Sequence, residues 1–367
     1  MRVAFLGTRG VPAQYGGFET AIEQLGQRIA SQNVDVYVYG AARSNGVNHW
    51  LGMKLIAMPA LKSKSLETIS RTTLSALHVI LRLRPDVVIL MNSANAPLIT
   101  LIKLFRIPVI AHLDGQEWLR PKWRGLRARY SKWATKWAAH QADAVIADNI
   151  AIKKYLDSEY SLNSIFIPYG SNISALPSMQ LRNIFDREKF VFNWADYFLV
   201  VARWEQENHV LEAIQAFNES GSTRSMVVVG SQVYVDDYGR SIHKAAQTNP
   251  NVHVLGSIWD KDLLAALYEG AAAYIHGHSV GGTNPSLLHA LHANIAVLSF
   301  DCEFNESVAK DKAKYWGSVA DLRNLIARQQ DFDTAPTRSV SFSELYNWDS
   351  CAQQYLELAQ SVAPGKR

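Results

Sequence analysis

The chain has 367 residues, of which 48% are hydrophobic and 19% are charged, and its formal net charge is +4. This composition is typical of a globular protein and excludes an intrinsically disordered chain. The length is too great for one ordinary hydrophobic core and predicts two domains. Only two cysteines occur, Cys302 and Cys351, which argues against a disulfide-built scaffold and fits a reducing cytoplasm.

The chain shows no segment that we expect to enter or cross a membrane. The first apolar run, Val3–Leu6, ends at Gly7 and is too short for a signal peptide. The most apolar region, residues 87–113, contains several polar side chains and two prolines. It therefore predicts a strand, a helix and a strand rather than a membrane span.

Short apolar runs alternate with helical patterns along the whole chain. Most are rich in valine and isoleucine and lack polar alternation, which is typical of parallel strands covered on both faces. Strands that alternate with helices predict doubly wound α/β sheets. The number of predicted strands is enough for two such sheets. The runs are Val3–Leu6, Val34–Tyr39, Lys54–Ala57, Val87–Met91, Val109–Leu113, Ala144–Ala147, Ile165–Ile167, Phe198–Ala202, Met226–Val229, Val252–Leu255, Ala272–Ile275 and Ala296–Phe300.

The stretch between Gly170 and Ala195 predicts the domain boundary. It has few apolar runs and contains Pro177 and a charged cluster at residues 186–189. We therefore predict an N-terminal domain over residues 1–175 and a C-terminal domain over residues 190–345. The remaining segment, residues 346–367, contains a helical pattern from Trp348 to Val362.

A glycine-rich loop follows a buried strand once in each half. Glycine lets a backbone approach a ligand closely, and the N–H groups of a helix's first turn attract anions. Taken singly, each loop is also explained as a strand-to-helix turn without a ligand. As a pair, they predict one diphosphate held between the two domains. The loops are Gly7-Thr8-Arg9-Gly10 with Tyr15-Gly16-Gly17-Phe18-Glu19-Thr20, and Val280-Gly281-Gly282-Thr283-Asn284-Pro285-Ser286.

Two residues near the second loop and its neighbouring strand have specific expected roles. Arg203 ends the first strand of the second half, where a guanidinium can neutralise a diphosphate, although it could also be a plain surface arginine. Proline suits the first position of a helix, so the helix is expected to begin at Pro285 with Asn284 as its N-cap.

Carboxylates at strand ends of the first half are candidates for catalysis. Asp114 and Glu117 lie in the loop His112–Trp118, where a carboxylate can accept a proton from a hydroxyl or stabilise an oxocarbenium-like centre. The alternatives are a turn residue for Asp114 and a first-turn helix acid for Glu117. Asp148 occupies a similar strand end.

The sequence contains no convincing metal site. Asp260 and Asp262 fit an Asp-x-Asp spacing, but they precede a helix start, where aspartates cap helices. Asp331 and Asp333 have the same spacing in a polar loop. Both pairs are interpreted as structural.

The segment 120–137 mixes basic residues with tryptophans and contains no acid. This composition is typical of a helix on an anionic membrane surface, and Lys62, Lys64, Arg71, Arg82 and Arg84 could extend it. The alternative is an amphipathic helix whose tryptophans pack on the sheet. Nucleic-acid binding is not expected, because no nucleic-acid motif is present.

Several strings of the sequence, taken together, resemble a known family. They are GTRGVPAQYGGFET, HLDGQEW, ARWEQEN, HGHSVGGTNPSLL and FDCEFNE. They resemble the retaining family 4 glycosyltransferases, in particular the rhamnosyltransferase-like branch of bacterial capsule, O-antigen and cell-wall polysaccharide biosynthesis. The resemblance implies a GT-B fold: two doubly wound Rossmann-like domains facing a central cleft, with the final helix crossing back to the first domain.

The resemblance also implies substrates, location and site residues. The donor is expected to be a nucleotide-diphosphate sugar and the acceptor a polyprenyl-diphosphate-linked saccharide, at the inner face of the cytoplasmic membrane, with no cofactor and no metal. Arg9 and Asp148 are expected near the acceptor, and His278 and Gly281 near the donor sugar, although His278 could equally be a packed core histidine. The donor diphosphate and nucleotide are expected to contact Gly16, Gly17, Arg203, Asn208, Gly282, Thr283, Asn284 and His289.

Two departures from the family pattern leave alternatives open. Asn208 stands where the broad family has a lysine, and Gly281 and His289 stand where it has two glutamates. Rhamnose from dTDP-rhamnose is the first expectation, with other hexoses open. The alternatives are a sugar-nucleotide-binding or scaffold subunit with impaired catalysis, suggested by His289, and a sugar-nucleotide epimerase or phosphorylase.

Overall fold

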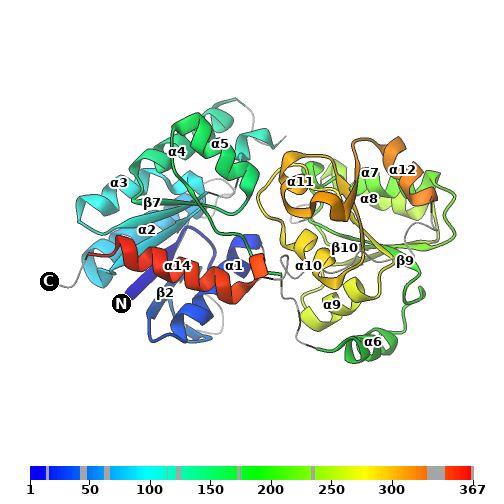
Figure 1. The fold of residues 1–367 in the computed structure, drawn as a ribbon, viewed down its shortest axis with the longest axis horizontal. Helices are drawn as coiled ribbons and strands as arrows, with labels where there is room; N and C mark the ends of the chain where they lie inside the picture. Colours follow the sequence, from blue (N-terminus) through cyan, green and yellow to red (C-terminus); the bar gives the residue numbers. More distant parts are fainter. Residues whose placement is uncertain are drawn as a thin grey trace. The chain divides into compact units, whose positions relative to one another are not determined.

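The structure is a computed structural model. It describes residues 1–13, 16–41, 48–61, 67–113, 115–120, 125–171, 174, 176–232, 236–328 and 344–364. The chain divides into two compact units, drawn in Figure 1. Unit 1 comprises Met1–Tyr169 and Leu345–Arg367, and unit 2 comprises Gly170–Glu344.

Unit 1 is built on an 8-stranded sheet with the order β3-β4-β2-β1-β5-β6-β7-β8. All described pairs are parallel except β3 with β4. The strands are β1 (Arg2–Leu6), β2 (Asp35–Gly40), β3 (His49–Trp50), β4 (Met53–Ala57), β5 (Val87–Met91), β6 (Val109–Leu113), β7 (Ala144–Ala147) and β8 (Ile165–Phe166).

The helices of unit 1 include one from the far end of the chain. α14 packs along α1, as Figure 1 shows in red and blue, and Arg28 pairs with Asp349 at 2.5 Å. Its buried face includes Trp348 and Tyr355. The helical segments are α1 (Gly17–Ala30), α2 (Glu67–His78), η1 (Val79–Leu83), η2 (Ser93–Asn95), α3 (Pro97–Leu104), η3 (Glu117–Leu119), α4 (Leu126–Gln141), α5 (Ile150–Tyr160) and α14 (Trp348–Val362).

Unit 2 is built on a 6-stranded, wholly parallel sheet with the order β11-β10-β9-β12-β13-β14. The strands are β9 (Tyr197–Val201), β10 (Ser225–Val229), β11 (Val252–Gly256), β12 (Ala273–His276), β13 (Ala296–Phe300) and β14 (Ala313–Trp316). The helical segments are α6 (Ser178–Arg187), η4 (Gln206–Asn208), α7 (Val210–Glu219), α8 (Asp237–Gln247), α9 (Lys261–Glu269), α10 (Pro285–Ala293), α11 (Glu303–Ala309), η5 (Lys310–Lys312) and α12 (Val319–Ala327).

The unalternated apolar runs are buried, as predicted for parallel strands covered on both faces. Every residue of β5 and β6 is buried, and the core of unit 2 contains Phe198, Phe217 and Trp316. Burying a large apolar side chain contributes about 1.5–3 kcal/mol to folding, so these runs are the main source of stability. The prediction of two doubly wound, Rossmann-like α/β domains is confirmed.

The strand order reverses once in each sheet. In unit 1 the chain builds outward from β1 through β2 and β4, and then crosses to β5 on the other side of β1. In unit 2 the reversal lies between β9 and β12. Ligands of open α/β sheets bind beyond the carboxyl ends of strands at such reversals. The first glycine loop follows β1, and the second follows β12.

Candidate functional site

The loops that follow β9 and β12 are fastened to each other at the reversal point of unit 2. The Ser279 N–H donates to the carbonyl of Glu207 at 2.9 Å, and a His209 ring nitrogen bonds the carbonyl of Gly277 at 2.7 Å. A Cβ on Gly277 would lie 2.3 Å from the Asn208 carbonyl oxygen, so only glycine fits there. The two strand ends therefore form one rigid platform.

The second glycine loop leads into a helix whose N-terminus carries no acid. Asn284 is the N-cap of α10, and its side-chain oxygen accepts from the Ser286 N–H at 3.1 Å, as predicted. Pro285 occupies the first turn, and no acidic residue follows it there. Gly281 has φ +149°, a conformation that favours glycine, and among the described residues beyond its two chain neighbours no atom lies within 4 Å of where its Cβ would be. No acid in the first turn therefore offsets the partial positive charge of this helix end.

Arg203 lies beside this platform, two residues after β9, and is exposed. Its carbonyl accepts from the Asn208 side-chain amide at 2.8 Å, and Asn208 is 3% exposed. The asparagine that replaces the family's lysine therefore holds the Arg203 loop in place. Its predicted contact with the donor phosphates stays a prediction.

His289 lies on α10, partly buried, and contacts the edge of the loop at Ser171. Its Nδ1 lies 2.9 Å from the Ser171 carbonyl oxygen. Burial lowers the pKa of His289 to about 4, so the ring is neutral at pH 7. Because a carbonyl only accepts, Nδ1 must carry the ring proton, and Nε2 is left as an acceptor. The His289 Nε2 can therefore accept a hydrogen bond from a ligand hydroxyl, as one oxygen of a glutamate carboxylate would.

Two further histidines lie at the end of β12 and in the loop after it. His276 is fully buried, and burial lowers its pKa to about 3. Its ring stacks on His278 with a centroid distance of 4.6 Å. The carbonyl of His278 accepts from the Asn305 side chain at 2.8 Å. His278 is thus held by the core on one side and partly exposed on the other.

The first glycine loop, in unit 1, is braced by carboxylates. The Arg9 N–H donates to Glu19 Oε1 at 3.2 Å, and the Ala13 N–H donates to Glu23 Oε2 at 2.9 Å. Glu19 lies in the first turn of α1 and is 9% exposed. A Cβ on Gly16 would lie 2.8 Å from Glu19 Oε2, so this carboxylate sits against the glycine pair at the helix start.

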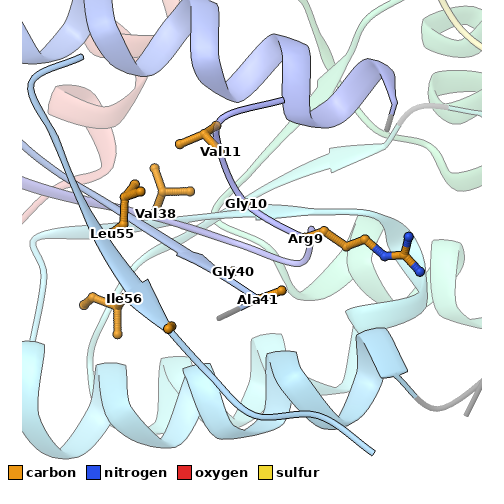
Figure 2. Close-up of a pocket in the computed structure, with 9 residues that line it drawn as sticks. Arg9, Gly10, Val11, Val38, Gly40, Ala41, Leu55 and Ile56 are labelled. Carbon is orange, nitrogen blue, oxygen red and sulfur yellow. The ribbon is translucent and has the colours of Figure 1, made fainter. Parts of the chain in front are cut away.

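A small cavity opens beside this loop, and Figure 2 shows its lining. Val38, Leu55 and Ile56 form its apolar side. Its volume of about 20 Å³ is room for little more than one water molecule. The Arg9 side chain points away from these apolar residues in Figure 2 and ion-pairs with Glu67 at 2.9 Å.

Comparison with known proteins decides the class of this chain. The domain described as Glycosyltransferase Family 4 matches residues 15–173, and that described as Glycosyl transferases group 1 matches residues 184–328. The chain is a two-domain glycosyltransferase of the GT-B fold. Among curated proteins, none matches its sequence.

Solved structures share the fold of this glycosyltransferase at low sequence identity. The sucrose-phosphate synthase of Thermosynechococcus elongatus is 17% identical, with a TM-score of 0.80 and 98% of each chain covered. The Anabaena protein HepE, solved with UDP-glucose, is 14% identical, with a TM-score of 0.74 and 98% and 100% covered. An α,α-trehalose-phosphate synthase (UDP-forming) of Burkholderia vietnamiensis is 12% identical, with a TM-score of 0.72 and the same coverage.

The three carboxylates predicted at strand ends of unit 1 differ in their surroundings. Asp114 lies outside the described residues. Glu117 pairs with Arg120 at 2.9 Å in the first turn of η3, which is the structural alternative noted above. Asp148 is 1% exposed and lies close enough to Tyr355 of α14 to raise the pKa of that hydroxyl, after the larger effect of burial. The catalytic and acceptor roles of these residues stay predictions.

His112 anchors the last helix of the chain to unit 1. Its Nδ1 lies 2.5 Å from the Tyr355 hydroxyl, and its Nε2 lies 3.3 Å from the Tyr169 hydroxyl. The ring is fully buried, which lowers its pKa to about 3. The His112 side chain therefore has a structural role, because its hydrogen bonds hold α14 against β6.

The basic segment forms an exposed face on α4. Arg127, Arg129, Lys132 and Lys136 are exposed, and Trp133 is 46% exposed. Arg71 does not belong to this surface, contrary to the prediction, because it is 5% exposed on the packed face of α2. Lys62 and Lys64 lie outside the described residues. No helix in the described part of the transferase is both long and apolar enough to span a bilayer.

The acidic pairs considered for a metal have ordinary roles where they are described. Asp260 caps α9 by accepting from the Asp262 and Leu263 N–H groups at 2.9 and 3.0 Å, as predicted. Asp331 and Asp333 fall outside the described residues. Among those that are described, no three acidic, histidine or cysteine side chains are grouped to bind a metal ion.

Sequence reasoning missed the residues that fix the loops. Glu19 and Glu23 brace the first loop, and Glu207 and Asn305 hold the second. Glu19 stands inside the GGFET string, one helical turn after Gly16. An acid at that spacing signals a side chain that reaches back to the preceding loop, as in a capping box.

Proposed function

We propose that this transferase moves a hexose or deoxyhexose from a nucleotide-diphosphate sugar to a lipid-linked saccharide, with retention of the anomeric configuration. Rhamnose from dTDP-rhamnose is the first candidate donor, on the resemblance of the sequence strings. The observation that carries the proposal is the pair formed by Arg203 and the acid-free N-terminus of α10, both at the strand-order reversal of unit 2.

The proposed donor contacts follow from charge. The N–H groups of Gly282 and Thr283, in the loop just before α10, would donate hydrogen bonds to the diphosphate, and Arg203 would add a full positive charge. These groups stabilise the leaving diphosphate as its charge grows, so the reaction requires no metal ion. His278 and Gly281 would face the donor sugar, and His289 Nε2 would accept from a ribose hydroxyl.

The acceptor side of the proposal rests on unit 1. Arg9 lies at the end of β1, exposed, and is assigned to the acceptor. The exposed basic and aromatic face of α4 supports attachment to an anionic membrane, where a polyprenyl-linked acceptor would be found. We expect binding to phosphatidylglycerol vesicles to fall in a Lys132→Glu/Lys136→Glu variant and to persist in Glu159→Gln.

A second candidate function is a nucleotide-sugar-binding subunit with impaired catalysis, because His289 replaces a carboxylate. The neutral ring with Nε2 as an acceptor argues for retained function. If catalysis is impaired at this position, His289→Glu restores transfer to an inactive wild type. If our proposal holds, wild type transfers and His289→Glu changes mainly the KM for the donor.

The test is incubation with dTDP-rhamnose and with UDP-, GDP- and dTDP-hexoses, with and without a lipid-linked saccharide. The proposal expects sugar transfer from one donor, only with acceptor, and unaffected by EDTA. Interconversion of a donor without acceptor would identify an epimerase instead, and binding without turnover would favour the subunit.

A further inference from the structure

The His289 side chain of α10 offers a ligand a single hydrogen-bond acceptor. Its Nδ1–H donates to the Ser171 carbonyl at 2.9 Å, and the ring is neutral at pH 7, so Nε2 carries a lone pair. Within the described part of the chain, no group bonds Nε2. The side chain is partly exposed and Nε2 is not a buried atom, so this nitrogen can accept from water or from a ligand.

Neighbouring groups hold the His289 ring in this orientation. Ser171 is 3% exposed, and its hydroxyl lies 3.1 Å from Nδ1 of His292, one turn further along α10. The fully buried Tyr268 of α9 packs against the edge of the ring, with centroids 5.8 Å apart and an interplanar angle of 71°. Turning the ring to present Nδ1 would break the bond to Ser171, so the tautomer is fixed.

His289 lies on the face of α10 that leads to the proposed diphosphate site. Residues three and four apart share one face of a helix, so His289 lies on the face of Pro285 and Ser286 in the first turn. The distance along the axis is about one turn, roughly 5.4 Å. In a nucleoside diphosphate the ribose follows the two phosphates. A diphosphate bound at the helix start therefore brings the ribose within reach of His289.

We propose that His289 selects a donor whose nucleoside carries 2′-deoxyribose: Nε2 accepts from the 3′-hydroxyl, and the site provides no acceptor for a 2′-hydroxyl. The inference deepens the proposed function and rests on it. It derives the sugar of the donor nucleotide from the site itself, whereas the proposed dTDP donor rests on the resemblance of sequence strings.

The number of acceptors decides the preference. A ribose presents its 2′- and 3′-hydroxyls side by side, and a carboxylate, with two oxygens, can accept from both. His289 Nε2 has one lone pair, and α10 contains no acidic residue that could supply a second acceptor. A 2′-hydroxyl brought to this site loses its water without gaining a partner, which weakens binding. A 2′-deoxyribose has only the 3′-hydroxyl and avoids this loss.

The experiment is calorimetric titration of the full-length protein with UDP, GDP, dTDP and 2′-deoxyuridine diphosphate (dUDP). UDP and dUDP differ only in the 2′-hydroxyl, and dUDP and dTDP only in a methyl group of the base. We expect wild type to bind dUDP at least as tightly as UDP, and His289→Glu to bind UDP about tenfold more tightly than dUDP.

Two controls accompany the titration. His289→Gln keeps one donor for the Ser171 carbonyl and one side-chain oxygen as acceptor, so it should keep the wild-type preference between dUDP and UDP. The ratio of dTDP to dUDP affinity should be the same in wild type and both variants, because these nucleotides share one sugar.

Wild type that binds UDP more than about threefold more tightly than dUDP would overturn the inference. An unchanged preference in His289→Glu, or binding of GDP alone, would overturn it as well and leave the proposed function standing. Failure of all four nucleotides to bind would overturn the proposed function itself.

Nitrogen NMR of labelled histidines gives a second readout without any variant. We expect Nδ1 of His289 to be protonated and Nε2 to be unprotonated in the free protein. Addition of dTDP should shift the Nε2 signal more than the Nδ1 signal. A histidine that only holds Ser171 would show no shift, and that result would contradict a contact with the ribose.

Discussion

The two glycine loops of this transferase follow similar buried strands, but the helices they lead into differ in charge. The first turn of α1 contains Glu19, a nearly buried carboxylate that accepts from the Arg9 N–H. α10 begins with Asn284 and Pro285 and has no acid in its first turn. A helix N-terminus attracts an anion only while the protein has not already placed one there.

The comparison gives the two loops different tasks. The first loop is braced from within by protein carboxylates, so its glycines serve a tight turn. The second loop leads into a helix without an acid in its first turn, so we propose that its glycines let a ligand approach beside Arg203. Matching glycine patterns in the two halves therefore do not require matching functions. The predicted diphosphate contacts of Gly16 and Gly17 are weaker candidates than those of Gly282 and Thr283.

The largest expected effect comes from giving the second loop the charge of the first. Pro285→Glu places a carboxylate in the first turn of α10, where repulsion should weaken binding of dTDP or UDP about 100-fold. Pro285→Gln is the matched control and should bind close to wild type. The melting temperature of the Glu variant should not fall below that of the Gln variant, because an acid stabilises a helix N-terminus. Calorimetry of both variants measures this, and equal affinities would contradict the account.

Removing the exposed cation beside the platform should have the next largest effect. Arg203→Met loses charge-assisted hydrogen bonds to the diphosphate, which corresponds to roughly 10–100-fold weaker nucleotide binding. Arg203→Lys keeps the positive charge but lacks the planar guanidinium, so its nucleotide affinity should lie between those of wild type and Arg203→Met. The KM for the sugar nucleotide, measured in a transfer assay, should rise in the same order, from wild type through Arg203→Lys to Arg203→Met. A Met variant with unchanged KM would show that Arg203 is only a surface residue.

The first loop should respond in stability rather than in nucleotide binding. Glu19→Leu leaves the Arg9 N–H without its acceptor and should lower the free energy of unfolding by about 1–3 kcal/mol. Glu19→Gln keeps a side-chain oxygen and should lose less. Chemical denaturation of the full-length protein measures the change in stability. Nucleotide affinity measured on the same samples shows whether binding changes as well. A Leu variant of normal stability that binds nucleotide more tightly would mean that Glu19 opposes a real anion site.

A separate, pH-dependent effect concerns the buried histidines near the two loops. The pKa of His289 falls from 6.5 to about 4, and that of His112 falls from 6.5 to about 3. Each ring is neutral when folded, so folding loses stability as the pH falls below 6.5, by roughly 1.4 kcal/mol per pH unit for each group. His289→Gln should flatten this dependence between pH 6.5 and 4 and leave stability above pH 7 with little pH dependence. Melting curves at half-unit pH steps measure how stability changes with pH. An unchanged pH dependence in His289→Gln would mean that the His289 ring is solvent-exposed and its pKa is not lowered by burial.

The sequence predicted the regular parts of the fold because they follow one physical rule. Strands such as Val87–Met91 are continuous apolar runs, and both faces of a parallel strand are buried. The same rule missed β3, which is only two residues long, and β14, whose Lys314 and Tyr315 are not buried. Asn284 and Asp260 were predicted as caps because capping is a local interaction between neighbouring residues.

The site could be predicted only as far as local patterns reach. The glycine loops, Arg203 and Pro285 were found because strand, loop and helix follow one another in the sequence. The contacts between His112 and Tyr355, and between Arg9, Glu67 and Arg71, join residues far apart in the chain. No spacing rule reveals such pairs, which is why Arg71 was predicted on a surface although it is buried.

The most direct measurement is a crystal structure of the full chain with its nucleotide-diphosphate donor or product bound. The account predicts phosphate oxygens within hydrogen-bond distance of the Gly282 and Thr283 N–H groups and of the Arg203 guanidinium. Phosphates bound instead at the start of α1, against Gly16 and Glu19, would contradict it.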